Sequence, residues 1–506
     1  MRSRRVGGRA AAVLIVAVLA LAPACGGGDG GADDDAAGTG RAGDGAAADP
    51  PEASDDRSDA VTDSELTDID DMTDEEVAAE VYVAGYPLVV TVRTLQRLGG
   101  LLGVNQLTWQ RSLAGPDSRT IVAPNRDTLY SVAVLDLRSG PVALTLPAVT
   151  DRYFTYQLLD AWTESFAYVG TRTTGGRAGT WVISPPGWDG EVPEGAEHIQ
   201  ATTPQVFLLG RFLVDDEADV AEVTAISERA ALQPLTALTG GDPAPPPPAL
   251  GEPAGTPQDV PADAGFFDEL GDALAVNPPT TDLQRRLFAR AEDLGIGPER
   301  HPTRDLDADA DVRAVLDAGA AEGSRRIARA AGRGAVEPDG GWGVDLEVGT
   351  YGDDTLLRAI VARVGWGANV PEEAVYPVAR VDADGERLSG DHIYRITFPA
   401  GGLPPVDAFW SLSAYGADMF FERHPSGRYT IGDRTAGLVL GDDGSLEIVL
   451  SHDEPRAAPG DRPVNWLPVP EGRFVLMLRL YLPGQAILAG EYDYPAIERV
   501  DDDAPA

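Results

Sequence analysis

The amino-acid sequence predicts an α+β protein of several domains, in which two related antiparallel β-sandwich domains are separated by a proline-rich connector and a helical segment. A repeated heptapeptide is the first observation behind this prediction, because Val169–Gly175 recurs far downstream as Ile431–Gly437. Each copy follows an aromatic, strand-like run and precedes a long apolar run, at Phe207–Leu213 and at Val475–Tyr481. Self-similarity of this kind indicates duplicated structural units. The length of 506 residues also exceeds that of one ordinary domain.

The charge balance is strongly acidic. The sequence has 40 basic residues, all of them arginine, against 81 acidic residues, and its formal net charge is −41. A surface of this charge repels nucleic acid and anionic lipid headgroups, so we expect no nucleic-acid partner. A GC-rich genome would favour arginine over lysine codons, and adaptation to salt would favour many carboxylates. The composition leaves both origins open.

Residues 1–24 are typical of a secretory signal peptide. Several arginines precede the apolar run Ala10–Ala22, which is too short to span a bilayer. Small residues then lead to Cys25, the single cysteine of the chain. This arrangement resembles a bacterial lipoprotein box, although Leu21 lies one place further from the cysteine than is usual. We therefore expect export and a lipid on Cys25 as the only membrane contact; the alternative is a secreted protein with an incidental cysteine.

The chain after the signal peptide begins with a tether. Residues 25–70 are rich in Gly, Ala, Asp and Ser, and they cannot bury enough apolar surface to fold. The first folded domain is predicted at residues 71–235, with a leading helix that opens at a capping box of Thr73 and Glu76 and ends near Gly99. Pro87 is expected to bend or divide this helix. Alternation and turn residues then predict strands at Ser131–Leu137, Val142–Leu146, Tyr153–Leu159, Thr180–Ser184 and Gln205–Leu213.

The middle of the chain changes character twice. Residues 236–262 are dense in proline and predict a stiff, extended linker. Residues 263–340 predict a helical segment. An Asp-rich run within it, from Asp305 to Asp311, lacks the glycine and glutamate that a calcium loop needs, so we predict no metal there. The helices of this segment are expected at Phe266–Ala275, Thr281–Leu294 and Val312–Ala331.

The second folded domain is predicted at residues 341–500. A helix is expected at Tyr351–Val364, with its cap at Asp353 or Asp354. Tight turns at Asp384 and Gly444 separate the strands that follow. These strands are predicted at Glu373–Val378, His392–Phe398, Phe409–Tyr415, Leu446–Leu450 and Arg473–Leu482.

Several motifs, in order, resemble two families of domains of unknown function. Tyr82–Pro87, Pro124–Tyr130 and Gly170–Gly175 resemble the family numbered 1254. Phe409–Leu412, Ile431–Arg434 and Asn465–Pro470 resemble the family numbered 1214. The resemblance covers nearly all of the chain from about residue 75 to residue 500. It implies two β-sandwich domains of similar topology with a helical part between them, and it implies no established reaction.

Candidate binding residues fall into two groups. Asn125, Arg126, Asp127 and Tyr130 form a polar turn at a strand entrance, and Arg152 and Asp160 could join them. Arginine can grip a carboxylate or phosphate with two hydrogen bonds. The alternative is a structural turn braced by these side chains.

The second group consists of Trp410, Arg434, Asn465 and Trp466. These side chains could form a stacking and hydrogen-bonding cleft, so we predict a binding protein for a small polar ligand, either sugar-like or carboxylate-bearing. Alternatively, the aromatic side chains fill the core of a sandwich.

An extracellular hydrolase is the alternative function, with Asp127 and Asp160 as paired carboxylates; such pairs work roughly 5 to 10 Å apart. The sequence lacks the serine-hydrolase elbow, the zinc-protease helix, the phosphate loop and the dinucleotide fingerprint. Its five histidines do not pair at ligand spacing. We therefore predict neither a metal nor a cofactor, and whether the protein is an enzyme stays open.

Overall fold

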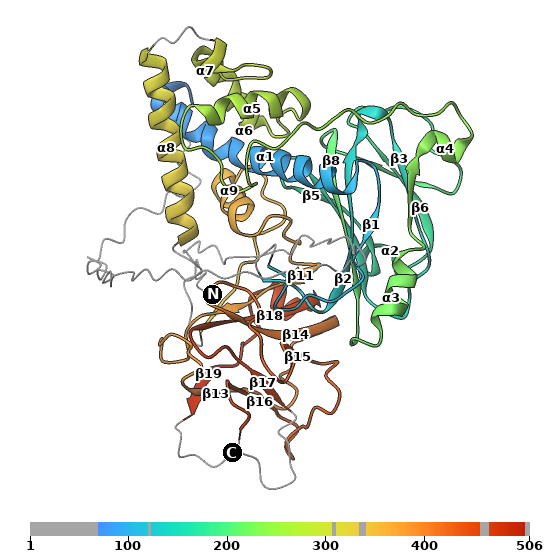
Figure 1. Ribbon diagram of the computed structural model, residues 1–506, viewed down its shortest axis with the longest axis vertical. Coiled ribbons are helices and arrows are strands. Elements are labelled where there is room, and N and C mark those ends of the chain that lie inside the picture. Colours follow the sequence, from blue (N-terminus) through green and yellow to red (C-terminus); the bar gives the residue numbers. More distant parts are fainter. Residues whose placement is uncertain (1–68, 120–122, 306–309, 333–340, 456–464, 501–506) are drawn as a thin grey trace, which may run out of the picture. The chain divides into compact units, whose positions relative to one another are not determined.

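The computed structural model describes residues 69–119, 123–305, 310–332, 341–455 and 465–500. Within these ranges the protein is α+β, with several antiparallel and mixed sheets together with helices (Figure 1). The predicted signal peptide, Cys25 and nearly all of the tether lie outside the described residues. None of the described helices has the length and apolar composition needed to cross a bilayer.

A long helix, α1 (Asp74–Leu102), opens the described chain. The predicted capping box is confirmed: Thr73 Oγ1 accepts from Glu76 N at 3.3 Å, and the Glu76 carboxylate accepts from Thr73 N at 2.8 Å. The helix continues through Pro87 and ends at Leu102, a few residues beyond the predicted end, with Gly103 as its C-cap. Most of its side chains are buried, so α1 lies within the protein and not on its surface.

The middle helices pack around α1 (Figure 1). The three predicted helices are confirmed, the second one ending in a 3₁₀ turn. Gly319 and Gly323 allow α8 to approach α1 closely, because a Cβ at either position would collide with Ala78 or Tyr82. The helices of this layer are α5 (Gly265–Val276), α6 (Asp282–Arg290), η3 (Ala291–Leu294), α7 (Pro302–Asp305), α8 (Ala310–Gly332) and α9 (Thr355–Val364).

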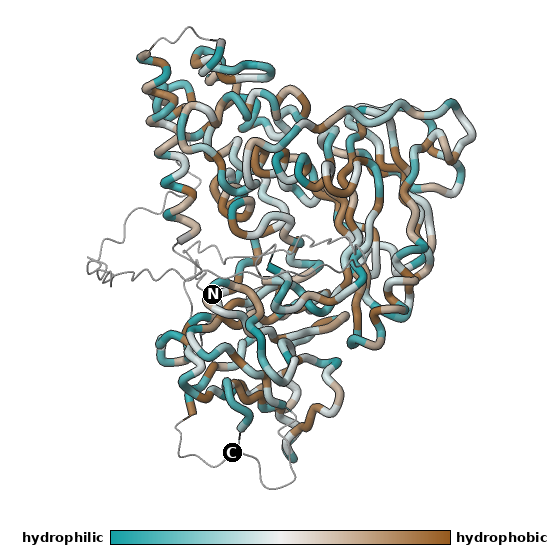
Figure 2. The backbone as a smooth tube through the Cα atoms, in the orientation of Figure 1, coloured by the Kyte–Doolittle hydropathy of each residue, from teal (hydrophilic) through white to brown (hydrophobic). Residues whose placement is uncertain are grey.

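Two sheets follow α1. The first has the strand order β1-β2-β8-β4-β5, and the second has the order β7-β6-β3-β9. Buried residues of both sheets belong to one hydrophobic cluster. Figure 2 shows hydrophobic stretches running along these strands. The bounds are β1 (Thr108–Trp109), β2 (Thr128–Asp136), β3 (Val142–Leu146), β4 (Phe154–Asp160), β5 (Ser165–Gly170), β6 (Gly179–Ser184), β7 (Glu197–Gln200), β8 (Gln205–Leu213) and β9 (Ala231–Pro234), with the short helices η1 (Ile69–Asp71), η2 (Leu137–Ser139), α2 (Thr171–Thr174), α3 (Val220–Ser227) and α4 (Leu235–Thr239).

Two further sheets follow α9, which Asp354 caps as predicted by accepting from Leu357 N at 2.9 Å. The first has the order β10-β12-β18-β14-β15, with β11 also on β18, and the second has the order β17-β16-β13-β19. One hydrophobic cluster again joins them. The bounds are β10 (Trp342–Gly343), β11 (Ala374–Val375), β12 (Val378–Ala379), β13 (Ile393–Phe398), β14 (Val406–Gly416), β15 (Thr430–Gly432), β16 (Leu446–Ser451), β17 (Trp466–Pro468), β18 (Phe474–Pro483) and β19 (Ile497–Val500), with α10 (Gln485–Leu488).

The two pairs of sheets share one topology. The order β2-β8-β4-β5 matches β12-β18-β14-β15, and the order β7-β6-β3-β9 matches β17-β16-β13-β19. In both second sheets one pair of strands is parallel, β6 with β7 and β16 with β17. We call residues 128–234 the first repeat and residues 374–500 the second repeat. The two copies of the heptapeptide occupy equivalent positions, because Gly170 ends β5 opposite Thr155 and Gly432 ends β15 opposite Ser411.

Candidate functional site

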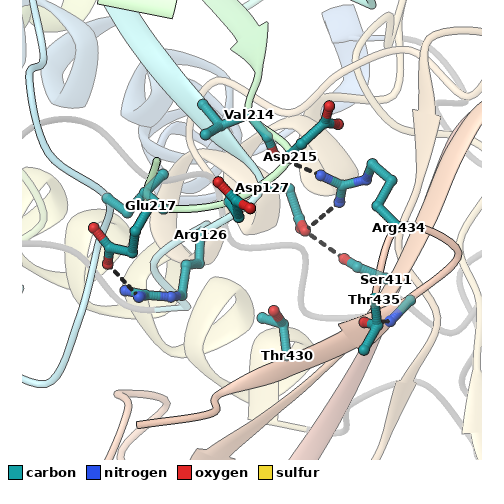
Figure 3. A pocket seen from close by; sticks show the side chains of 12 residues that line it. Arg126, Asp127, Val214, Asp215, Glu217, Ser411, Thr430, Arg434 and Thr435 are labelled. Atoms are coloured by element: carbon teal, nitrogen blue, oxygen red, sulfur yellow. Dashed lines mark hydrogen bonds and ion pairs between the residues drawn. The ribbon is translucent and has the colours of Figure 1, made fainter. Parts of the chain in front are cut away.

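A pocket of about 200 Å³ lies where the two repeats meet. We call it the junction pocket (Figure 3). The first repeat and the residues just before it contribute the entrance to β2 and the loop after β8, and the second repeat contributes β14, β15 and its heptapeptide. The pocket is lined by Leu113, Arg126, Asp127, Val214, Asp215, Asp216, Glu217, Ser411, Thr430, Gly432, Arg434 and Thr435.

An ion pair between the buried Asp127 and the partly exposed Arg434 forms one wall of the pocket. Arg434 Nη2 donates to Asp127 Oδ1 at 2.7 Å, and Ser411 Oγ donates to Asp127 Oδ2 at 2.6 Å. Arg434 Nη1 donates to the carbonyl of Val214 at 2.6 Å, and its guanidinium lies 4.4 Å from the centre of the Phe409 ring. Asp127 is only 4% exposed. The structure thus joins one residue from each of the two predicted groups.

The polar turn at residues 125–127 positions Asp127. Asn125 Oδ1 accepts from Asp127 N at 2.6 Å, which is the local turn expected of asparagine at this place. Asn125 Nδ2 donates to the Tyr481 hydroxyl at 2.8 Å and so ties the turn to β18 of the second repeat. Asn125 is buried behind the pocket and does not line it. Its role is to hold Asp127 in place.

Arg126 lies on another side of the pocket (Figure 3). It donates to the carbonyl of Ala114 at 2.6 Å and to the exposed carboxylate of Glu217, also at 2.6 Å. Its guanidinium lies 5.6 Å from the centre of the Tyr429 ring. Both arginines of the pocket are therefore paired with carboxylates of the protein itself.

Arg152 and Tyr130 lie away from this pocket. Arg152 donates to Asp219, which directly precedes α3, at 2.7 Å and to the carbonyl of Leu213 at 3.3 Å. Tyr130 lies under the guanidinium of Arg211, 5.8 Å from it, and only 5% of the residue is exposed. Neither residue lines the pocket together with Asp127 and Arg434.

The predicted aromatic cleft is not formed by Trp410, Trp466 and Asn465. Trp410 packs against Phe398 inside the core of the second repeat, with ring centres 5.4 Å apart. The indole of Trp466 is buried and donates to the carbonyl of Ser451 at 3.2 Å. Asn465 holds the backbone of Val439 with two hydrogen bonds, of 3.0 and 2.6 Å. Large aromatic side chains stabilise a core most when fully buried, which explains these positions.

Asp160 lies at the far end of the first sheet from Asp127. It pairs with Val206, which pairs with Leu135 of β2, whereas Asp127 precedes the opposite end of β2. The seven steps from Thr128 to Leu135 correspond to about 23 Å. This separation exceeds the roughly 5 to 10 Å of a catalytic carboxylate pair. The structure therefore does not bring Asp127 and Asp160 together.

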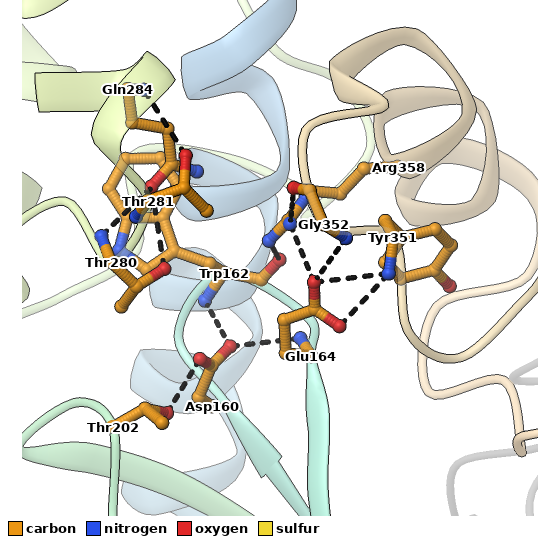
Figure 4. A network of polar contacts seen from close by, with 10 residues as sticks. All are labelled: Asp160, Trp162, Glu164, Thr202, Thr280, Thr281, Gln284, Tyr351, Gly352 and Arg358. Carbon is orange, nitrogen blue, oxygen red and sulfur yellow. Dashed lines mark hydrogen bonds and ion pairs between the residues drawn. The ribbon is translucent and has the colours of Figure 1, made fainter. Parts of the chain in front are cut away.

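Asp160 instead organises a turn (Figure 4). It accepts from Trp162 N at 2.8 Å, from Glu164 N at 2.9 Å and from Thr202 Oγ1 at 2.7 Å. Burial raises the pKa of Asp160 to about 6. The turn is held to the start of α9 by Arg358, which donates to Glu164 at 2.7 Å and to the carbonyl of Trp162 at 2.9 Å.

Sequence reasoning did not identify several buried polar residues. Glu373, Arg211 and Arg479 are each at most 1% exposed and lie between the repeats. A charged residue inside an apolar strand was the available signal for the two arginines, at Phe207–Leu213 and Val475–Tyr481. His424 and His452 also approach each other, with ring centres 5.3 Å apart. Across the described ranges no group of three or more His, Cys, Asp or Glu side chains is arranged to hold a metal ion.

One solved structure shares the fold of this chain. The crystal structure of the VPA0106 protein from Vibrio parahaemolyticus superposes with a TM-score of 0.67 and 24% sequence identity, over 85% of this chain and 100% of that one. The crystal structure of an uncharacterised protein from Burkholderia cenocepacia gives a TM-score of 0.40 and 13% identity, over 82% of this chain and 88% of that one. No curated protein matches the chain.

Family models match both repeats. Each model is described as a protein of unknown function, and together they agree with the resemblance seen in the motifs. The chain carries a match to the DUF1254 model at residues 104–234, followed by a match to the DUF1214 model at residues 373–485.

Proposed function

We propose that the protein binds a small polar ligand in the junction pocket. The observation that carries this proposal is the ion pair of the buried Asp127 with the partly exposed Arg434, which faces a pocket built by both repeats. Ligand sites are concave and contain a few fixed polar groups, and they often lie where two domains meet. At about 200 Å³ the pocket is smaller than a typical drug-sized site, so the ligand is a small molecule.

The uncommitted groups of the pocket favour a sugar-like ligand over a carboxylate-bearing one. Both arginines already bind protein carboxylates. Asp215 presents its carboxylate, and Asp216 and Glu217 each use one carboxylate oxygen within the protein and keep the other, and such oxygens accept hydrogen bonds. A ligand rich in hydroxyl donors complements these acceptors, whereas a carboxylate would be repelled by them.

The hydrolase alternative has weaker support. The distance between Asp127 and Asp160 does not suit joint action on one glycosidic bond. Each oxygen of the Asp127 carboxylate also already accepts a hydrogen bond, one from Arg434 and one from Ser411. Binding without chemistry is therefore the function that we propose.

We also propose that the mature protein is exported and held at the outer face of the cell membrane by a lipid on Cys25, and that each pair of sheets is a two-layered sandwich. The sequence of residues 1–25 supports the anchor. The shared hydrophobic cluster of each sheet pair supports the sandwich. A Cys25→Ser variant should move from the membrane fraction to the soluble fraction and should lose labelling by a fatty acid. Unchanged fractionation and labelling would contradict the anchor.

A thermal-shift screen tests the proposed ligand class. A ligand that binds only the native state raises the melting temperature. We expect neutral sugars or polyols to raise it, and matched organic acids to leave it unchanged. An Arg434→Met variant should lose the response. A response to acids alone would contradict the proposed ligand class.

A further inference from the structure

Two buried arginines occupy equivalent positions in the two repeats. In the first repeat, Gly170 of β5 pairs with Thr155 of β4, which pairs with Arg211 of β8. Arg211 and its counterpart Arg479 in the second repeat are each only 1% exposed. Because their positions and burial match, the contacts of one arginine can be compared directly with those of the other. The equivalent row of the second repeat consists of Gly432, Ser411 and Arg479.

The second-repeat arginine uses both of its terminal nitrogens. Arg479 Nη1 donates to Ser413 Oγ at 2.8 Å. Its Nη2 donates to the carbonyl of Ala123 at 3.0 Å and to the Tyr415 hydroxyl at 2.6 Å. Each terminal nitrogen therefore has at least one acceptor.

The first-repeat arginine uses only one of its two terminal nitrogens. Arg211 Nη1 donates to the amide oxygens of Gln157 and Asn369, at 3.0 and 2.9 Å. Arg211 Nη2 is buried and has no hydrogen-bond partner within the described part of the chain. A buried donor of a charged group is costly to leave without an acceptor.

No carboxylate compensates the charge of Arg211. Among the described residues, none forms an ion pair with it. Glu373, which directly precedes β11, accepts instead from Arg172 Nε and from the Tyr153 hydroxyl, each at 2.7 Å. A buried charge is normally paired, so a counter-charge is missing beside Arg211.

One hydroxyl group beside Arg211, that of Tyr130, is available as a donor. The Tyr130 ring lies 5.8 Å from the guanidinium carbon, and the Tyr130 hydroxyl has no hydrogen bond to any described residue. The Tyr376 hydroxyl accepts from Asn369 Nδ2 at 2.8 Å and is also hydrogen-bonded to the Tyr481 side chain, so it is already engaged within the protein. A positive charge combined with a free donor calls for a negatively charged acceptor.

We propose that Arg211 Nη2 and the Tyr130 hydroxyl bind a small monovalent anion of the size of chloride between the two repeats. This site is distinct from the junction pocket, whose uncommitted groups are acceptors and call for donors. The anion neutralises Arg211 and occupies the place that protein acceptors fill beside Arg479.

Thermal unfolding of the purified full chain tests this proposal. The melting temperature is measured in sodium chloride or bromide and in sodium gluconate, at equal ionic strength, because gluconate is too large for the site. We expect a saturable rise in the halides of roughly 2 °C at about a hundredfold excess over the dissociation constant. Equal melting temperatures in all three salts would overturn the proposal and leave water as the partner of Nη2.

Two variants locate the effect. Arg211→Met should abolish the difference between halide and gluconate. Tyr130→Phe keeps the ring and removes one donor, so it should raise the halide dissociation constant about fivefold. The matched control is Tyr156→Phe, because the Tyr156 hydroxyl is buried and bonded to Ser131 at 3.0 Å. If Arg211→Met fails to fold, Tyr130→Phe decides: an unchanged halide constant in that variant overturns the proposal.

Discussion

Arg172 Nε donates to Glu373 Oε2 at 2.7 Å, and this ion pair is the counterpart of the pair between Arg434 and Asp127. Arg172 and Arg434 are the arginines of the two heptapeptides. Glu373 directly precedes β11, and Asp127 directly precedes β2. The two positions are equivalent, because Ala374 of β11 pairs with Tyr481 and Thr128 of β2 pairs with Leu213, each two residues after the buried arginine of its strand. Each repeat thus uses the arginine of its heptapeptide to bind the acidic residue that directly precedes the other repeat, and the two contacts are reciprocal.

The first prediction concerns the pair of Arg172 and Glu373. Arg172→Met leaves the carboxylate of Glu373 buried and without its cation, so we expect a loss of about 3 kcal/mol in the free energy of unfolding. A double variant with Glu373→Gln should recover much of this loss. The measurement is denaturant unfolding. Arg177→Met removes an exposed pair and should cost less than about 1 kcal/mol; a similar loss in both arginine variants would contradict the prediction.

The second prediction concerns Asp127. Asp127→Asn keeps an oxygen for Ser411 and removes the charge that holds Arg434, so the fold should persist while Arg434 loses its fixed position. The thermal shift produced by a ligand of the junction pocket should therefore disappear. The control is Asp117→Asn, since Asp117 is exposed and lies outside the pocket lining. Undiminished ligand response in Asp127→Asn would show that the pair does not form the binding site.

The third prediction concerns Asp160 and pH. Burial raises its pKa from 3.8 to about 6, so the folded state holds the proton more tightly than the unfolded state. The resulting stabilisation is complete below pH 3.8 and is lost as pH rises through about 6. The shift corresponds to about 3 kcal/mol. Asp160→Asn should remove this part of the pH dependence. The stability of the variant relative to the wild type should therefore increase between pH 4 and pH 7. Glu228→Gln, which changes an exposed carboxylate, is the control, and parallel pH profiles for the wild type and Asp160→Asn would contradict the assignment.

The fourth prediction concerns the start of α1. Thr73→Ala removes the hydroxyl that accepts from Glu76 N and should cost about 1 kcal/mol. Because α1 is buried by the other helices, the loss should appear in global unfolding as well as in exchange of the first amides. Exchange of backbone hydrogens, followed residue by residue, measures both. Glu75→Ala, at the neighbouring exposed position, should change neither the global stability nor the exchange of the first amides by a comparable amount.

The sequence predicted the repeat because a topology that occurs twice places similar residues at similar points. Local signals also placed the cap at Thr73 and the turn at Asn125, since both depend on hydrogen bonds between close neighbours. The predicted domain boundaries remain predictions. The leading helix, assigned from sequence to the first domain, packs with α5, α8 and α9, and no local pattern indicates such a partnership.

The site was harder to predict for two physical reasons. Strands β2, β8 and β18 are buried along their whole length, so they lack the alternation that would tell which side chain faces which layer. Trp410 lies in a similar buried run of β14, so the sequence left open whether it lines a cleft or fills the core, and the structure places it in the core. The pairs of Asp127 with Arg434 and of Glu373 with Arg172 join residues about two to three hundred positions apart, and one sequence carries no signal of such contacts.

The exchange of arginines also has an evolutionary meaning. A homodimer with a twofold axis must make every contact at its interface twice, because one residue change appears on both subunits. A fused chain is released from that constraint, and either copy can drift alone. Here one copy of the contact faces a cavity while its counterpart pairs with a fully buried glutamate, so the two equivalent contacts have different surroundings.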